Sequence, residues 1–263
     1  MTIREIADDC GISVGSCDAI LTDDLHMKRV CAKFVPRLLT DDQREQRQTI
    51  PGDLLEFSCE DAQFLKNIVT GDESWVYGYD PGTKQQSSQG PSSPRPKKGR
   101  QVRNKTKVML LAFFYSEGIV HHEYAPDGQT INNEFYLEVL RHLRESVLRK
   151  RPEKWRDDDW ILHHDNAPAH TSHLVQKFLA KHGTAQLQQP PCSPDLAPCD
   201  FFLFPRLKKF LKGHRFEATE DIKRTSTKTL LDIPKEEFAK RFQQWQKRWA
   251  KCVAAEGNNV EDN

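Results

Sequence analysis

Three aspartates stand in places where a strand, or the turn beside it, would more often carry an apolar residue. Asp72 falls inside a strand signal, Asp165 ends an apolar strand, and Asp200 lies between a proline-punctuated loop and a helix. A carboxylate in such a place costs stability unless it is paired or binds a cation. Several carboxylates that converge on one edge of a sheet form an oxygen-ligand site for Mg²⁺ or Mn²⁺. Two such ions would activate a water or a 3′-hydroxyl and stabilise the leaving oxygen of a phosphodiester.

The elements around these acids follow an α/β pattern. We predict strands at 68–79, with a break around Gly71, and at 108–115, 118–124, 160–163 and 185–188, and helices at 132–148, 171–180, 205–211 and 235–254. An aromatic stripe marks the last of these helices. Its members are Phe238, Phe242, Trp245 and Trp249. We interpret the stripe as core packing or a partner-helix contact rather than a platform for stacking bases.

Residues 2–21 are predicted to form two short helices around a turn. Gly11 breaks the first helical pattern, and Ser13 is suited to cap the second helix. A glycine turn between two such helices is the signature of a helix-turn-helix, although any helical hairpin in a core shows the same spacing. Lys28 and Arg29 follow as a small basic flank and are candidate DNA contacts.

Two further segments are predicted as connections. Residues 34–66 are punctuated by Pro36 and Pro51, with Thr40 suited to cap a helix. Residues 81–107 are rich in Pro, Ser and Gln and then become basic, with seven positive charges and no acid in the last thirteen positions. The seven are Arg95, Lys97, Lys98, Arg100, Arg103, Lys105 and Lys107. A solvated loop would explain them, but their density favours contact with a phosphate backbone.

The whole-chain composition excludes some classes of protein. The 263 residues hold 39 Lys+Arg against 38 Asp+Glu, a formal net charge of +1, which excludes a simple polycation but not a local nucleic-acid-binding patch. The longest apolar run, 108–115, is far too short to span a membrane, and the N-terminus lacks the apolar stretch of a signal peptide. Seven cysteines without a C-x-x-C pair indicate a reducing compartment, the cytosol or the nucleus.

Three longer motifs carry a resemblance. They are Thr70-Gly-Asp-Glu-Ser-Trp75, His163-His-Asp-Asn-Ala-Pro-Ala-His170 and Ser193-Pro-Asp-Leu-Ala-Pro-Cys-Asp-Phe-Phe-Leu-Phe-Pro205. In this order and at this spacing they closely resemble the motifs of mariner-family transposases. The separation of Asp165 and Asp200 also matches that of the last two aspartates in the family's catalytic triad. The resemblance extends over essentially the whole chain.

This resemblance implies an RNase H-like α/β fold in which Asp72, Asp165 and Asp200 hold two divalent ions, Mg²⁺ or Mn²⁺. It implies an endonuclease that cuts double-stranded DNA at transposon ends and joins it at TA targets, working in the nucleus, with a homodimer as the expected assembly and no membrane partner. His164, Asn166 and His170 would orient the carboxylates or the phosphate without binding the ions themselves. The His164 region and the basic loop would contact the phosphate backbone.

The resemblance also predicts a domain layout. Residues 1–30 look like part of the family's second helix-turn-helix module, 31–63 like its linker, and 64–263 like its catalytic domain. The motif at 34–40 resembles a linker sequence used in dimer contacts, and 81–107 corresponds to a clamp loop that contacts DNA and the other subunit.

The sequence departs from the family pattern in three places. The chain opens inside the second helix-turn-helix, which predicts an N-terminally truncated copy with impaired recognition of inverted repeats. Ser87–Pro91 lacks an expected Trp, and Cys192 replaces a common Tyr. No stretch resembles a SET domain, so methyl transfer is not expected.

Alternatives stay open at this point. The chain could be a catalytically silent DNA-binding or dimerisation protein derived from a transposase, or an RNase H-type nuclease, against which the helix-turn-helix argues. Four histidines near Asp165 invite a zinc hypothesis: His163, His164, His170 and His173. No cysteine pair accompanies them, so we do not expect zinc there. Strand alternation places Glu73 on the face opposite Asp72, and we leave it out of the site. Loop capping suffices to explain Asp195.

Overall fold

The structure is a computed structural model in which two compact units can be distinguished, Met1–Val35 with Asp80–Val102, and Pro36–Tyr79 with Arg103–Asn263. It describes residues 3–27, 38–61, 63–81, 101–150, 152, 160–212, 214, 216 and 218–260, with backbone alone at 79–81 and 101–105. Among the described residues, none of the helices has both the length and the apolar composition that a bilayer-spanning segment needs.

The N-terminal unit contains two short helices, α1 (Ile3–Cys10) and α2 (Val14–Ala19), followed by a π-helical turn, η1 (Ile20–Asp24). Gly11 between them has a φ of +66°, a left-handed conformation that glycine adopts without strain. The Ser13 side chain caps α2 by accepting a hydrogen bond of 3.0 Å from the Ser16 N–H. The two helices predicted around a glycine turn are thus confirmed.

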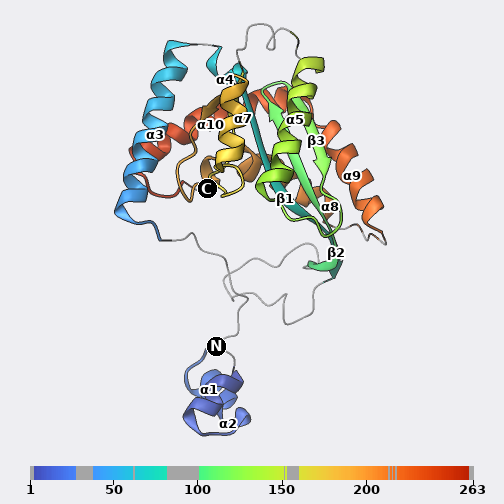
Figure 1. Cartoon of the computed structure of the whole chain (residues 1–263). Coiled ribbons are helices and arrows are strands. Elements are labelled where there is room, and N and C mark those ends of the chain that lie inside the picture. Colours follow the sequence, from blue (N-terminus) through green and yellow to red (C-terminus); the bar gives the residue numbers. More distant parts are fainter. Residues whose placement is uncertain are drawn as a thin grey trace. The chain divides into compact units, whose positions relative to one another are not determined.

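The larger unit is built on a five-stranded sheet with strand order β3-β2-β1-β4-β5. Figure 1 labels the first three of these strands, β3, β2 and β1. The strands are β1 (Ile68–Pro81), β2 (Gln101–Tyr115), β3 (Gly118–Tyr124), β4 (Ile161–His163) and β5 (Ala185–Leu187). β2 and β3 pair antiparallel, whereas β4 runs parallel to both β1 and β5. The predicted hairpin is confirmed, and β2 begins earlier than expected, inside the predicted basic loop.

β1 runs through Gly71 without the predicted break. The glycine is required there because another strand's side chain approaches closely. A Cβ atom on Gly71 would lie 2.0 Å from the Phe113 ring of β2. The prediction was wrong because it took the glycine as a turn signal, whereas glycine inside a strand also marks a close approach.

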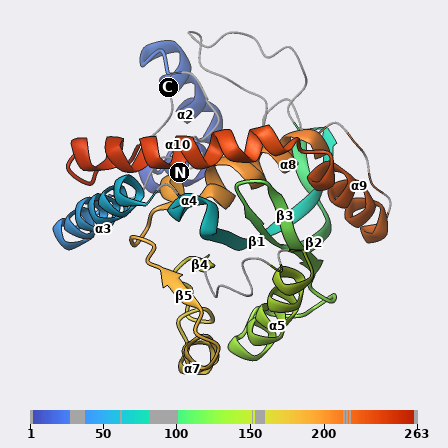
Figure 2. The same cartoon turned by 90° about the horizontal axis from the view of Figure 1, so that it is seen from above.

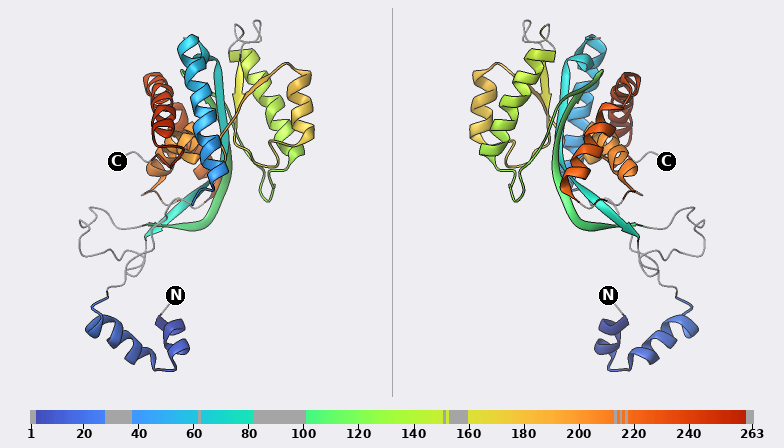
Figure 3. Two further views of the ribbon diagram at one scale, coloured as in Figure 1. Left: turned by 90° about the vertical axis from the view of Figure 1, so that its left-hand side faces the viewer. Right: turned by 90° about the vertical axis from the view of Figure 1, so that its right-hand side faces the viewer.

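Helices cover both faces of the sheet (Figures 2 and 3). They are α3 (Asp41–Glu60), α4 (Phe64–Asn67), α5 (Asn133–Lys150), α7 (His173–Lys181), α8 (Phe204–Leu211), α9 (Thr219–Leu231) and α10 (Lys235–Ala254). Short turns η2 (Pro194–Leu196) and η3 (Cys199–Leu203) precede α8. α5 and α7 lie on one face, and α3, α8, α9 and α10 lie on the other. The cap of α7 is Ser172 rather than the expected Thr171, and α9 was not predicted.

The aromatic stripe of α10 lies in the core. Phe238, Phe242, Trp245 and Trp249 are each at most 2% exposed. Phe238 and Phe242 contact the Phe114 ring of β2 at centroid distances of 5.5 and 6.0 Å. Rings buried against the sheet are unable to stack on bases, so the core-packing interpretation is confirmed.

The described part of the predicted linker, 31–63, is mostly helix α3. Its N-terminus carries a capping box, in which Thr40 Oγ1 accepts from the Gln43 N–H and Gln43 Oε1 accepts from the Thr40 N–H. Pro51 lies inside the helix and is buried, instead of interrupting the chain. A proline there costs about 3 kcal/mol, so α3 depends on its packing against α10 rather than on local preference.

A buried arginine holds α3 to two distant segments. The Arg47 side chain is fully buried and donates to both carboxylate oxygens of Asp195, at 2.9 and 2.7 Å. It also donates to the carbonyl oxygens of Gly257 and Asn258 at 2.8 and 3.1 Å. Asp195 accepts a further bond from the Val260 N–H. The sequence analysis assigned Asp195 only a loop-capping role. In the structure its carboxylate joins the η2 turn to α3 and to the segment after α10.

We expect Arg47→Met to lower the free energy of unfolding by about 3–5 kcal/mol, because it removes the charged partner of the largely dehydrated Asp195 carboxylate. Urea unfolding followed by tryptophan fluorescence measures this loss. The matched control is Arg44→Met on the same helix, whose ion pair with Asp41 is exposed and should change stability by less than about 1 kcal/mol. Equal losses in the two variants would contradict a structural role for the buried pair.

Candidate active site

Parallel pairing brings the first two aspartates to the same level of the sheet. Thr70 of β1 is in register with His163 of β4. Asp72 and Asp165 each lie two residues further along the chain. Because parallel strands advance together, the backbone positions of Asp72 and Asp165 lie at about the same level, just beyond the carboxyl end of β4. The negative charges of Asp165 and Asp200 both act on the Asp72 carboxyl and raise its pKa.

The third aspartate arrives on η3. The backbone N–H of Asp200 donates to the Ala197 carbonyl oxygen at 2.9 Å. Its neighbours Cys199 and Phe202 are 1% and 4% exposed, and they anchor the turn in the core. Asp200 therefore lies between the proline-rich loop and α8, as the sequence predicts, on a packed π-helical turn that continues into the helix.

The three carboxylates repel one another in a partly dehydrated place. Burial raises the pKa of Asp72 to about 8, and the charges of Asp200, Glu73 and Asp165 add to the shift. Burial also raises the pKa of Asp200 to about 6, although the Lys208 ammonium opposes this shift. Near neutral pH, Asp72 thus holds its proton unless a cation enters the site.

Asp165 is bound to a buried histidine. Its Oδ1 lies 2.6 Å from His170 Nδ1 and accepts the Ala167 N–H at 3.0 Å. Burial raises the pKa of Asp165, but these contacts outweigh it and hold that pKa below its usual value. Burial lowers the pKa of His170, but Asp165 and Glu73 outweigh it and raise the pKa to about 9. His170 is therefore a buried imidazolium.

Glu73 belongs to this site, contrary to the sequence prediction. Its side chain does point away from Asp72, as strand alternation requires. However, Glu73 Oε2 lies 3.3 Å from His170 Nε2, so the histidine bridges Glu73 on one side and Asp165 on the other. The prediction failed because it considered only one face of the strand. The missed signal was a second acid on a central strand, which needs a cation nearby.

His164 and Asn166, which the sequence predicted would orient the carboxylates or the phosphate, make hydrogen-bond contacts with neighbouring protein groups. His164 is 5% exposed, contacts the Tyr136 hydroxyl at 2.8 Å and Gln186 at 3.2 Å, and stacks on the His170 ring. Burial lowers the pKa of His164 to about 4, so it is neutral and shielded from any phosphate. Asn166 donates to the Gln189 carbonyl oxygen at 2.6 Å.

His163 is equally structural. It contacts Thr70 Oγ1 and Gln189 Oε1, each at 2.8 Å, and packs edge-on against Trp245. These contacts tie His163 to β1 and to the loop that follows β5.

Most predicted DNA contacts lie outside the described residues. These are Lys28, Arg29, Arg95, Lys97, Lys98 and Arg100. Arg103 and Lys105 lie on β2, where the backbone alone is described. The exposed Lys107 places its ammonium 3.9 Å from the centre of the Trp75 ring. Its outward position on the strand is compatible with a phosphate contact.

The donor set of the site suits a hard divalent cation. Asp72, Asp165 and Asp200 offer only carboxylate oxygens, which Mg²⁺ and Mn²⁺ prefer. Among the described residues, the three acids do not close to within 4.8 Å of one another as a single ligand group. The raised pKa of Asp72 supports a cation at this site, because a nearby positive charge would stabilise the ionised carboxylate that burial and the neighbouring acids disfavour.

The mixed sheet covered by helices on both faces, with three aspartates at strand and turn positions along one edge, defines an RNase H-like transposase domain of the DDE type. The family model "Transposase (partial DDE domain)" matches residues 80–157. The mariner Mos1 transposase of Drosophila mauritiana is 31% identical over 261 residues, which cover 99% of this chain and 75% of that protein. The chain belongs to the mariner transposase family.

Solved structures agree. The catalytic domain of Mos1 matches with a TM-score of 0.73 at 29% identity, over 87% of this chain and 100% of that one. A Mos1 paired-end complex with Mg matches with a TM-score of 0.76 at 30% identity, over 99% of this chain and 76% of that one. The human histone-lysine N-methyltransferase SETMAR is 27% identical over 98% of this chain, which spans 37% of that protein's length.

We expect Asp72→Asn to raise the melting temperature of the metal-free protein by several degrees at pH 8. The folded-state pKa of Asp72 lies above its unfolded value, so the native protein binds the proton more tightly. Its favourable contribution is complete below about pH 4 and is lost as the pH rises towards 8. The amide carries no charge to repel Asp200, so the variant's advantage should grow between pH 5 and 8. Melting curves across this range measure it, and a pH-independent difference would contradict the argument.

Proposed function

We propose that Asp72, Asp165 and Asp200 hold two divalent ions, Mg²⁺ or Mn²⁺, and that the chain cuts and joins double-stranded DNA with them. The proposal is supported above all by the convergence of three carboxylates of which one keeps its proton to about pH 8. The relative whose structure is titled a paired-end complex with Mg supports the choice of metal and of DNA. When bound, the ions supply Lewis-acid activation of a water or 3′-hydroxyl and neutralise the leaving oxygen.

The chain's own residues position this chemistry. Asp72 lies on β1 and Asp200 on the packed η3 turn, so the backbone that carries each carboxylate is fixed before a cation arrives. His170 fixes Asp165 from behind and balances the charge of Glu73. Lys208, which donates to Ser74 Oγ at 2.7 Å, adds a positive charge beside Asp200. These cations reduce the repulsion that a polyanionic DNA would meet at an acidic site.

The remaining functional assignments are also proposals. Residues 1–30 serve as a DNA-binding module and the catalytic domain occupies 64–263, with 31–63 connecting them through α3. The basic residues of the 95–107 segment contact the phosphate backbone of transposon ends, TA dinucleotides are the target, and two copies of the chain work together in the nucleus. Similarity to transposases supports these assignments.

The test is metal-dependent nicking of supercoiled plasmid DNA. We expect cleavage with Mg²⁺ or Mn²⁺, and a fall of at least about a hundredfold in Asp200→Ala, because charge stabilisation by a bound metal is worth several kcal/mol. The matched control is Asp127→Ala, an exposed acid in the loop before α5, which should keep the wild-type rate.

Two outcomes would overturn the proposal. Retained DNA binding without nicking in either metal would favour a catalytically silent DNA-binding protein. Faster cleavage of RNA·DNA hybrids than of duplex DNA would instead favour an RNase H-type nuclease.

A further inference from the structure

A second group of metal-ligand side chains lies where β3 meets α5, with β2 between it and the strand that carries Asp72. His121 and Glu123 are two residues apart on β3, in register with Phe113 and Leu111 of β2. Residues at this spacing point to the same face of a sheet. That face is covered by α5, which contributes His142. Two imidazoles and one carboxylate therefore meet from two elements.

Their ligand atoms are already close to the spacing that a metal requires. Glu123 Oε2 lies 3.2 Å from His121 Nε2 and 2.9 Å from His142 Nδ1. In a tetrahedral zinc site with bonds of about 2.0–2.2 Å, neighbouring ligand atoms lie about 3.3–3.6 Å apart. Shifts of a few tenths of an ångström would therefore admit the ion. In the described part of the chain, these are the three residues whose ligand atoms all lie within 4.8 Å of one another.

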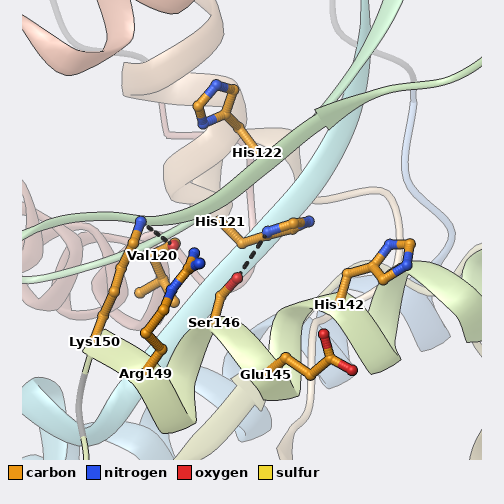
Figure 4. Close-up of a pocket in the computed structure, with 8 residues that line it drawn as sticks. All are labelled: Val120, His121, His122, His142, Glu145, Ser146, Arg149 and Lys150. Atoms are coloured by element: carbon orange, nitrogen blue, oxygen red, sulfur yellow. Dashed lines mark hydrogen bonds between the residues drawn. The ribbon is translucent and has the colours of Figure 1, made fainter.

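The Ser146 hydroxyl forms a hydrogen bond with the ring of His121 and fixes its orientation. The other ring nitrogen of His121, Nδ1, lies 3.0 Å from Ser146 Oγ, one helical turn after His142 on α5 (Figure 4). Histidines that bind metals are commonly fixed in this way through the nitrogen that does not face the ion. The His121 side chain is 15% exposed and that of Glu123 22%, so both ligands are partly dehydrated and held in place.

The surroundings leave access for the ion. A pocket of about 510 Å³ opens beside the cluster, lined by His121, His142 and Ser146 among others (Figure 4). His142 is half-exposed, so an ion and one further ligand such as water can reach the group. The nearby Lys150 ammonium donates to the Val120 carbonyl oxygen at 2.6 Å, which holds that positive charge against the backbone.

We propose that His121, Glu123 and His142 form a zinc site with one coordination position open to the pocket. Two imidazoles favour zinc over Mg²⁺, which prefers oxygen ligands alone. The bound ion ties the edge strand β3 to α5 and so stabilises one side of the catalytic domain. This proposal is independent of the function proposed for the aspartates.

Cobalt serves as the spectroscopic probe, because Co²⁺ absorbs strongly in a tetrahedral site with imidazole ligands and weakly in a six-coordinate oxygen site. We expect metal-stripped protein to show the strong visible absorption with one equivalent of Co²⁺, and Zn²⁺ to abolish it. In His142→Gln the zinc affinity should fall at least a hundredfold, and in Ser146→Ala about tenfold, since Ser146 only orients a ligand. Zinc should also raise the melting temperature of Asp72→Asn, whose aspartate site is disabled, and adding His142→Gln to that variant should remove the rise.

Two controls make the result specific. His214→Gln removes an exposed histidine elsewhere and should leave cobalt absorption and zinc affinity unchanged. Asp72→Asn disables the aspartate site and should also leave both unchanged. Circular dichroism of the metal-free variants confirms that each is folded. Absence of the tetrahedral spectrum, its persistence in His142→Gln, or its loss in Asp72→Asn would overturn the proposal.

Discussion

The rest of the larger unit is organised around the repulsion among carboxylates that the fold forces together. β1 and β4 run in parallel register, so Asp72 and Asp165 emerge level, and the packed η3 turn brings Asp200 beside them. Burial and the neighbouring negative charges make ionisation of Asp72 unfavourable and raise its pKa to about 8. Only a rigid scaffold can hold like charges so close, and the sheet with helices on both faces provides it. The same grouping of acids that suits a cation therefore lowers the stability of the fold when no cation is bound.

The positive groups near the acids divide into two kinds. His170 is buried between Glu73 and Asp165 and compensates part of the charge permanently. Lys208 lies on α8 beside Asp200 and adds a second fixed charge. Neither of these positive groups cancels the upward shift in the pKa of Asp72, which remains the most strongly shifted of the three aspartates. Asp72, whose pKa is raised mainly by burial, is therefore the carboxylate that a bound cation would stabilise most.

Sequence reasoning succeeded where the evidence was local or motif-based. The hairpin and the bounds of α10 followed from polarity patterns, and the family followed from long motifs. It failed where a long-range contact decides the role of a residue. The sequence indicated a turn at Gly71, whereas the glycine makes room for the Phe113 ring of the neighbouring strand. It placed Glu73 on the opposite face from Asp72, and the contact of Glu73 with His170 on that face was not foreseen. Arg47 on α3 gave no sequence signal, because its partners lie far along the chain.

That distance has a consequence for how the protein is made. Arg47 donates to carbonyl groups 210 and 211 residues further along the chain. During synthesis, α3 therefore emerges long before the groups that satisfy its guanidinium exist. Contacts of such high sequence separation slow folding and leave apolar surface exposed meanwhile. Until residue 258 has left the ribosome, the buried face of α3 therefore lacks the groups that satisfy its arginine in the folded protein.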